Sequence, residues 1–573
     1  MKRKLLGTAK FRHIVCFAAA FFLLCIAALL TVRFSAVRNA SNPAFLMEHN
    51  PLLREDSKLL RLIEEGESCD TFLLGSYSAQ ALDPAYAGEL ADGVCCNLCT
   101  EESDPSKTAA IFDLLTATRT VKTVLLAFSP YDASDLDRHS AYEAADLFTG
   151  EAERDYDDVR RIGNLETYLT ERADRFLPQK SLSLTRAEEW LQTVRHIAAV
   201  CREKNIRFVT FLCPVYRDKR DGLNAKELAA FRTELAEALA EAEFWDFTDA
   251  ALCSDARFFY NRYEFRETIG DKMLARVFGD KTIYVPDDFG VCGVNRTAPN
   301  TKKRAASYET DVPILLYHHV TEEAGYGDAV ISLERLEEHF TALHDAGYTT
   351  VLPEELIDYV YLGKELPEKP ICITFDDGYQ SNYELVYPLL EKYDFKIAIF
   401  PIGWAFGKDT YKDTDQPMLA HFDYAAAREM LASGRVSLGS HTYDMHQSET
   451  LETADKPRYS ALRQSAEKKE DYIAALKNDF ENCAEVFERE LNLPVTALSY
   501  PHGSYSLLSE AVFMRLGVKI TLSTEYSEKN TLVKGLPQSL YALRRFTVSE
   551  SSGADALLAL IASQYGDESG TGR

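Results

Sequence analysis

Short apolar runs alternate with amphipathic stretches along most of this chain. Apolar runs bounded by turn residues are typical of buried strands, and stretches with apolar positions three and four residues apart are typical of helices. In the first half the predicted strands are 71–77, 123–130 and 206–215. The predicted helices there are 109–118, 186–205 and 225–243. Strands that alternate with helices indicate a parallel α/β sheet, which we place at residues 67–286.

The same alternation returns in the second half. The predicted strands are 371–375, 396–400, 435–440, 495–500 and 518–524. The predicted helices are 383–393, 424–433 and 467–491. Five or more strand–helix units in about 250 residues predict a (β/α) barrel, which we place at residues 312–560, before a polar tail at 561–573. Residues 287–311 are polar and irregular, so we expect them to form the linker between the two domains.

The N-terminus carries an uncharged apolar run, residues 14–32, that follows several basic residues. Its 19 residues are close to the roughly 20 that a helix needs to cross a bilayer. A signal peptide is cleaved after small residues, and the nearest sites would need Phe34 or Arg38. We therefore favour a single-pass membrane anchor within residues 1–36, followed by a stalk at 37–66, over a signal peptide or a buried core helix. Basic residues before the span place both large domains outside the cytoplasm.

Composition narrows the range of partners. The net charge of −26 disfavours nucleic acid as a partner, because phosphates must be neutralised by Lys and Arg. The 12 cysteines show no paired metal-ligand spacing. Several lie in apolar, strand-like runs, such as Cys213 and Cys372. We expect mainly buried thiols, with one or two disulfides in an oxidising compartment as the alternative.

Three polar clusters follow predicted strands of the second half, at the edge where βα barrels build their sites. The first is TFDDG, Thr374–Gly378. Two adjacent carboxylates repel each other, and a metal bound to one would leave the other free as a base. A solvated Asp-Asp-Gly turn explains these residues alone, but not the apolar strand that leads directly into them.

The second cluster is SHTYDMH, Ser440–His446. On a regular helix His441 and His446 would point about 140° apart, whereas in a loop after a strand they can converge. Two histidines, one carboxylate and a water are a common catalytic metal set. A lone histidine is more often a structural residue, but a pair beside a strand end, with an Asp-Asp-Gly turn elsewhere, favours a metal site.

The third cluster is SYPHGSY, Ser499–Tyr505, in which a proline and a glycine shape a loop that can point a backbone N–H at an oxyanion.

In this order and spacing the three clusters resemble the motifs of the polysaccharide deacetylase (NodB-homology) family, over roughly residues 310–560. The His-to-His spacing and the YP-x-G loop are most similar to surface poly-N-acetylglucosamine deacetylases. Supporting segments are 312–320, 346–351, 421–434 and 543–548.

The resemblance implies a distorted (β/α) barrel that holds one divalent metal ion, typically zinc. By similarity, Asp377, His441 and His446 would bind the metal, and Asp376 would be the general base that activates the attacking water. The metal and a backbone N–H near His502 would stabilise the oxyanion that forms on an N-acetyl carbonyl. Acetate would leave, and a free amine would remain on the sugar.

The sequence departs from the family pattern in two places. His502 stands where many members have an aromatic residue. No histidine follows it, although many members carry a C-terminal Leu-x-His that supplies the general acid. The proton for the leaving amine must come from elsewhere, and we name His502, His318 and His319 as candidates. The residues of the third motif that we expect to contact substrate are Tyr500, Pro501 and Tyr505.

The first half resembles an SGNH-type hydrolase that has lost its catalytic residues. Segment 71–84 is similar to the first SGNH block, but Tyr77 occupies the nucleophile position. In the closing block, Asn261 and Glu264 stand where that family has Asp and His. An amide cannot stabilise an imidazolium, so we expect a non-catalytic, flavodoxin-like domain. Ser78 as a shifted nucleophile is the alternative.

Taken as a sequence, the chain is expected to be an anchored surface enzyme that removes N-acetyl groups from a GlcNAc-containing polysaccharide. Two alternatives stay open. The same metal and base would serve an O-acetyl ester hydrolase acting on a polysaccharide. A glycan-binding or assembly protein with a degenerate site is the non-enzymatic alternative.

Overall fold

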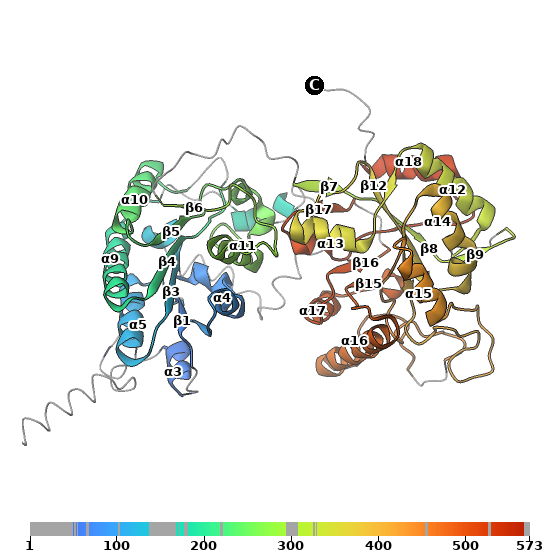
Figure 1. Cartoon of the computed structure of the whole chain (residues 1–573), viewed down its shortest axis with the longest axis horizontal. Helices are drawn as coiled ribbons and strands as arrows, with labels where there is room; N and C mark the ends of the chain where they lie inside the picture. The colour runs from blue at the N-terminus through green and yellow to red at the C-terminus, as the bar shows by residue number, and fades with distance from the viewer. Residues whose placement is uncertain are drawn as a thin grey trace, which may run out of the picture.

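The computed structural model describes residues 50, 53, 56–64, 68–100, 103–136, 168–170, 172–176, 182–217, 222–293, 308–324, 327, 329–452, 456–524 and 529–565. The predicted anchor at 14–32 lies outside these residues, as does much of the stalk, whose described part holds α3 (Ser57–Glu64). Among the described helices, none is long and apolar enough to cross a membrane. The structure is of the mixed α/β class, with two units side by side (Figure 1).

The first unit is built on a sheet in the order β2-β1-β3-β4-β5-β6, in which only β6 runs antiparallel. Its strands are β1 (Thr71–Gly75), β2 (Cys95–Asn97), β3 (Thr123–Phe128), β4 (Arg207–Leu212), β5 (Glu243–Asp246) and β6 (Val291–Cys292). The parallel strands follow the order 2-1-3-4-5, which is the flavodoxin-like order. Every residue of β1 and β3 is buried, as expected for parallel strands covered on both faces.

Helices cover both faces of this sheet (Figure 1). On one face lie α5 (Pro105–Thr118), α9 (Ala187–Lys204) and α10 (Ala225–Ala238). On the other face lie α4 (Pro84–Leu90) and α11 (Glu267–Phe278). A disulfide joins Cys69, just before β1, to Cys96 in the neighbouring β2. Most of the free cysteines of the described residues are buried, whereas Cys292 is exposed.

The second unit carries a parallel sheet in the order β14-β13-β12-β8-β18. These strands are β8 (Ile314–Tyr317), β12 (Pro370–Asp377), β13 (Ile397–Pro401), β14 (Val436–Leu438) and β18 (Phe546–Thr547). Beyond β14, a parallel bridge from Ser440 to Leu498 leads to β15 (Ala497–Ser499), which pairs with β16 (Ile520–Leu522). A second bridge, Leu522 to Leu543, returns to the segment before β18 and closes the strands into a ring.

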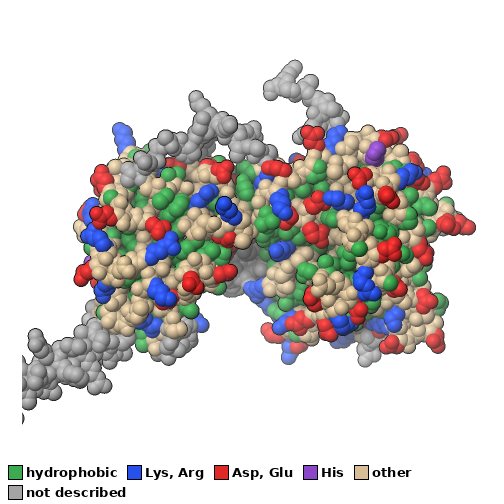
Figure 2. Space-filling model, viewed as in Figure 1, with side chains coloured by type: hydrophobic (Ala, Val, Ile, Leu, Met, Phe, Trp, Pro, Cys, Tyr) green, Lys and Arg blue, Asp and Glu red, His purple; other side chains and the backbone are tan. Residues whose placement is uncertain are grey.

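Helices surround this ring, and short strands lie outside its path. The helices are α12 (Leu333–Asp345), α13 (Pro353–Leu362), α14 (Tyr387–Tyr393), α15 (Tyr424–Ala432), α16 (Lys469–Leu491), α17 (Leu507–Arg515) and α18 (Ala554–Tyr565). The short strands are β7 (Glu309–Asp311), β9 (His319–Thr321), β10 (Val330–Ser332), β11 (Thr349–Thr350) and β17 (Thr531–Val533). Acidic and basic side chains are interspersed over the visible face of both units (Figure 2).

The two units pack directly on each other. Val533 and Leu536, which lie between β16 and β18 in sequence, are fully buried in the apolar cluster of the first unit. The Lys272 ammonium and the Thr268 hydroxyl, both on α11, donate to the carbonyl oxygen of Gly535 at 2.6 and 2.9 Å. Tyr284 lies at the same junction and donates its backbone N–H to Tyr361. The first unit therefore holds a loop of the second in its own core.

Candidate metal centre

The turn after β12 places two aspartates at the carboxyl edge of the ring. Asp376 and Asp377 end a strand in which every residue is buried, and β8 and β13 flank it in parallel. Asp377 adopts φ +70° and Gly378 φ +81°, so the chain turns sharply at this point. A Cβ on Gly378 would come within 2.6 Å of the Pro401 Cβ, so glycine fits here both by conformation and by space.

Two histidines reach the same edge from the loop after β14. The backbone N–H of His441 donates to the carbonyl of Pro401 at the end of β13, which fixes where this loop starts. The His441 Nδ1 lies 2.9 Å from the Ser499 carbonyl oxygen. With Nδ1–H donated there, the lone pair of Nε2 faces Asp377. Asp479 on α16 accepts the N–H groups of residues 443 and 444, which holds the loop between the two histidines.

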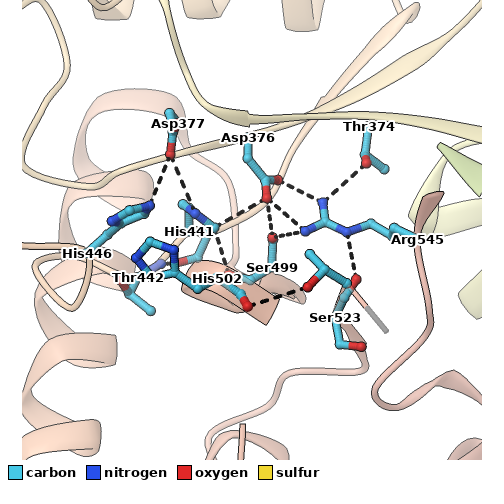
Figure 3. A network of polar contacts seen from close by, with 12 residues as sticks. Thr374, Asp376, Asp377, His441, Thr442, His446, Ser499, His502, Ser523 and Arg545 are labelled. Carbon is cyan, nitrogen blue, oxygen red and sulfur yellow. Dashed lines mark hydrogen bonds and ion pairs between the residues drawn. The ribbon is translucent and has the colours of Figure 1, made fainter. Parts of the chain in front are cut away.

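Asp377, His441 and His446 form a group whose geometry fits a metal ion (Figure 3). The Asp377 Oδ1 lies 3.5 Å from the His441 Nε2 and 3.7 Å from the His446 Nε2. Ligands about 2.0–2.1 Å from a tetrahedral zinc ion lie roughly 3.3–3.4 Å apart, so the three atoms need little movement to share one. The Asp377 Oδ1 is buried and has no hydrogen-bond partner among the described residues. A buried carboxylate oxygen without a donor is what a bound cation would satisfy.

Asp376 is held by a different partner, Arg545, which precedes β18. The fully buried guanidinium donates to both carboxylate oxygens of Asp376 at 2.8 and 2.7 Å (Figure 3). The Ser499 hydroxyl adds a third donor at 2.9 Å. Burial alone would raise the pKa of Asp376, but the Arg545 charge outweighs it and keeps the pKa well below the usual range. Asp376 is therefore ionised.

Arg545 is the residue of this site that the motifs did not identify. It lies in the segment 543–548, but no role could be assigned to it from sequence. Its partners Thr374, Asp376, Ser499 and Ser523 are distant along the chain. An arginine within an apolar, strand-like stretch of a barrel was the one signal available, because such a residue must find an acidic partner inside.

A pocket of about 240 Å³ opens beside the three candidate ligands. It is lined by Leu316, His318, Asp376, His441, His446, His502, Gly503, Thr524 and Thr547. The ring of His502 lies 4.6 Å from that of His446, and burial lowers the pKa of His502. The His318 Nδ1 is buried and makes no hydrogen bond among the described residues. His319 is not among the lining residues; its Nδ1 lies 2.9 Å from the Ser381 hydroxyl.

The residues that we expected to contact substrate lie behind this pocket. Tyr500 is fully buried and Pro501 is buried too, whereas Tyr505 is 8% exposed and stacks on Tyr500. The side chain of Tyr500 faces α17, because His441 and β16 hold the backbone of β15 from the other sides. The structure therefore gives these aromatic rings a place beneath the third motif, not a place in the pocket.

The three degenerate SGNH positions make contacts within the first unit. The Asn261 side-chain amide donates to the Glu264 carboxylate at 2.5 Å, and Asn261 also accepts the N–H of Glu264. The backbone N–H of Tyr77 donates to the Ser103 hydroxyl. Asn261 thus organises its own turn, which is a structural role.

The fold and the site together define an α/β protein with a candidate metal-assisted hydrolase centre. Residues 363–521 match the family model described as polysaccharide deacetylase. This part of the chain is a polysaccharide deacetylase domain, and the protein is a hydrolase. The resemblance read from the three motifs is confirmed for this domain, whereas the SGNH resemblance of the first unit stays a prediction.

Several known proteins are similar to this domain. YxkH of Bacillus subtilis (strain 168), which is named after the same family, is 29% identical over 253 residues, 44% of this chain and 76% of its own. The poly-beta-1,6-N-acetyl-D-glucosamine N-deacetylase of Escherichia coli (strain K12) is 34% identical over 139 residues, but the match spans only 20% of that protein. The Staphylococcus aureus (strain MRSA252) enzyme of the same name is 25% identical over 182 residues, 56% of its length.

Among solved structures, a de-N-acetylase from Aggregatibacter actinomycetemcomitans covers 44% of this chain and 99% of its own. Its sequence identity is 24% and its TM-score is 0.37.

Proposed function

We propose that this protein hydrolyses N-acetyl groups of a GlcNAc-containing polysaccharide with the help of one divalent metal ion, zinc by preference. The observation that carries the proposal is that the two adjacent aspartates have different partners. Asp377 joins His441 and His446 in a ligand set, while Arg545 keeps Asp376 ionised beside the same pocket. In metal-assisted N-deacetylation, a metal polarises the acetyl carbonyl and a base activates the water that attacks it.

A metal bound by the three ligands would polarise the acetyl carbonyl as a Lewis acid. The residues of the chain supply the rest. Asp376 lines the pocket as a carboxylate and takes a proton from the attacking water. His441 is held in one orientation by the Ser499 carbonyl, so its ligating nitrogen is preorganised.

The loop of the third motif offers one backbone donor to the oxyanion. Within this loop the N–H groups of Gly503 and Ser504 already donate to the carbonyls of Tyr500 and Pro501. Among the described residues, the N–H of His502 makes no such backbone bond, and His502 lines the pocket. We assign this N–H to the oxyanion, where a preorganised donor is worth about 10²–10³-fold in rate.

The proton for the leaving amine comes from a histidine that lines the pocket. His318 and His502 do so, whereas His319 is bonded to Ser381 outside it. Of the three residues considered from sequence, His318 and His502 therefore stay in the proposal. Changing each to Gln separates them, because loss of the acid slows N-deacetylation more than cleavage of an activated acetate ester, whose leaving group needs no proton.

The substrate class is tested with the purified full chain and a panel of N-acetylated and O-acetylated polysaccharides. We expect released acetate and new free amines in equal amounts, with β-linked GlcNAc polymers as substrates. Acetate without amines would assign the protein to the O-acetyl ester hydrolases. Binding of the polymers without any acetate release, at saturating zinc, would overturn the proposed activity.

The proposal places both domains outside the cytoplasm. Basic residues before the apolar run 14–32 support this orientation, and so does the Cys69–Cys96 disulfide, since disulfides persist in oxidising compartments. A protease added to intact cells should digest both domains. Protection of both domains until the cells are lysed would reverse the orientation.

A further inference from the structure

The turn that delivers Arg545 to the site has an unusual backbone. Ala542 adopts φ +52°, a left-handed conformation that L-residues with a Cβ avoid. The turn lies beside β16, and the Arg545 Nε donates to the carbonyl of Ser523 just after that strand. A strained turn persists only where its surroundings hold it, so the groups that bind Ala542 decide where Arg545 lies.

Thr521, in the middle of β16, supplies those groups. The backbone N–H of Ala542 donates to the Thr521 hydroxyl oxygen at 2.7 Å, and the N–H of Leu543 donates to the Thr521 carbonyl at 2.9 Å. Thr521 is fully buried. Its side chain therefore fixes the strained residue three positions before Arg545.

A buried carboxyl group orients this hydroxyl. The Thr521 hydroxyl donates to the Glu510 Oε1, on α17, at 2.8 Å. Because its hydrogen points to Glu510, the hydroxyl presents a lone pair to the N–H of Ala542. Glu510 is fully buried and also lies beside the Tyr500 hydroxyl. Burial raises the pKa of Tyr500, and the neighbouring Glu510 carboxyl raises it further. The proposed mechanism gives Glu510 no role.

We propose that Glu510 and Thr521 are positioning residues of the deacetylase, which hold the turn at Ala542 so that Arg545 meets Asp376. The inference rests on the proposed function, in which Asp376 is the base. It extends the site to α17 and to the middle of β16. Neither residue touches the pocket.

The protonation state of Glu510 agrees with this role. Burial, the largest cause, raises the pKa of Glu510 to about 8, and the groups that face it among the described residues are the hydroxyls of Thr521 and Tyr500. Tyr472, on α16, is a further titratable group near Tyr500 and also raises the pKa of Tyr500, after burial and Glu510. Near neutral pH the folded protein therefore holds a proton that the unfolded chain releases above about pH 4.3. This part of the stability is present below that pH and is lost as the pH rises towards 8.

The first test replaces Thr521 by Val, which keeps the shape and removes the hydroxyl. We expect turnover by the full chain to fall at least about tenfold, with KM and zinc content unchanged, and Thr521→Ser to restore it. Thr350→Val is the matched control, because the Thr350 hydroxyl accepts the N–H of Lys396 in the same way but lies in β11, beside the start of β12 and away from the site. The control should lose stability and keep its turnover.

Two further readouts need no substrate, so they separate this inference from the proposed function. In Thr521→Val, hydrogen exchange at the amides of 542–543 should quicken, while exchange in β12 stays unchanged. In Glu510→Gln, which keeps the acceptor and cannot ionise, the loss of stability between about pH 4.3 and 8 should flatten. Unchanged exchange at 542–543, or equal turnover losses in Thr521→Val and Thr350→Val, would overturn the inference whatever the wild-type substrate proves to be.

Discussion

At the scale of single residues, the site depends on the separation of two neighbours. Asp376 and Asp377 are adjacent in sequence, but one faces a guanidinium and the other faces two imidazoles. The left-handed backbone conformation of Asp377 turns the chain directly after Asp376, and the two side chains meet different partners. Each carboxylate therefore has one task, which avoids the repulsion that two free carboxylates would feel.

The two histidines lead to the first prediction. Changing His441 or His446 to Ala should remove the bound metal and the activity together, because two ligands do not complete a zinc site. Metal content per chain is measured after dialysis against a weak chelator. His196→Ala is the control, since that histidine lies on the surface of the first unit. A variant of His441 or His446 that retained one zinc per chain would contradict the ligand assignment.

Sequence reasoning named the three candidate ligands, which the structure brings together, but not everything that supports them. TFDDG and SHTYDMH are local strings, so their residues could be named before any contact was known. Arg545 acts through Asp376, which lies 169 positions away in the sequence, and Glu510 acts through Thr521, which lies 11 positions away. Neither residue lies in a motif with a fixed spacing. Tyr500 was named because it belongs to a motif, but its side chain is buried below the loop. The direction in which a side chain points depends on tertiary packing.

At the scale of elements, the glycine turn after β12 is the most constrained feature. A residue other than glycine at position 378 would have to adopt a positive φ. Its Cβ would also lie 2.9 Å from the Cα of Pro401. Since β13 carries that proline, the two strand ends could not keep their spacing. The apolar runs of β12 and β13 were predicted correctly because both are continuous and fully buried, whereas β2, β6 and β18 are too short to give a pattern.

The second prediction follows from this turn. Gly378→Ala should lower turnover at least about tenfold and weaken metal binding, because Asp377 precedes the residue that must shift. Gly347→Ala is the control: its φ is +78°, but an added Cβ meets nothing within 4 Å. That control should cost only the roughly 1–2 kcal/mol of the left-handed conformation and leave activity unchanged. Thermal unfolding and turnover of both variants provide the measurement, and equal effects on turnover would show that the turn is not specific to the site.

At the scale of the whole molecule, one of the contacts between the first unit and the deacetylase domain is a tyrosine that packs between two glycines. An added Cβ on Gly363 would lie 2.2 Å from the Tyr284 ring, and one on Gly535 would lie 3.1 Å from it. The ring therefore occupies space that both glycines leave open. Sequence indicated two α/β domains with a linker, but not this contact, since nothing in a sequence shows how two domains face each other.

The third prediction concerns that contact. Tyr284→Ala should uncouple the units, so that calorimetry of the full chain resolves two unfolding transitions where the wild type shows one. Loss of a partly buried aromatic ring costs about 1–3 kcal/mol at this junction. Tyr284→Phe keeps the ring and should behave like the wild type. Two transitions in the wild type would show that the units unfold independently without any mutation.

The central claim is that Asp376 is the base of a metal-dependent deacetylase. It is tested most directly by the turnover of Asp376→Asn at saturating zinc, with one zinc per chain verified in the same sample. The amide can still accept a hydrogen bond from Arg545, and the ligand set of Asp377, His441 and His446 is untouched. We predict full metal occupancy and a loss of roughly 10²–10⁴-fold in turnover. Near-normal turnover in that sample would contradict the account.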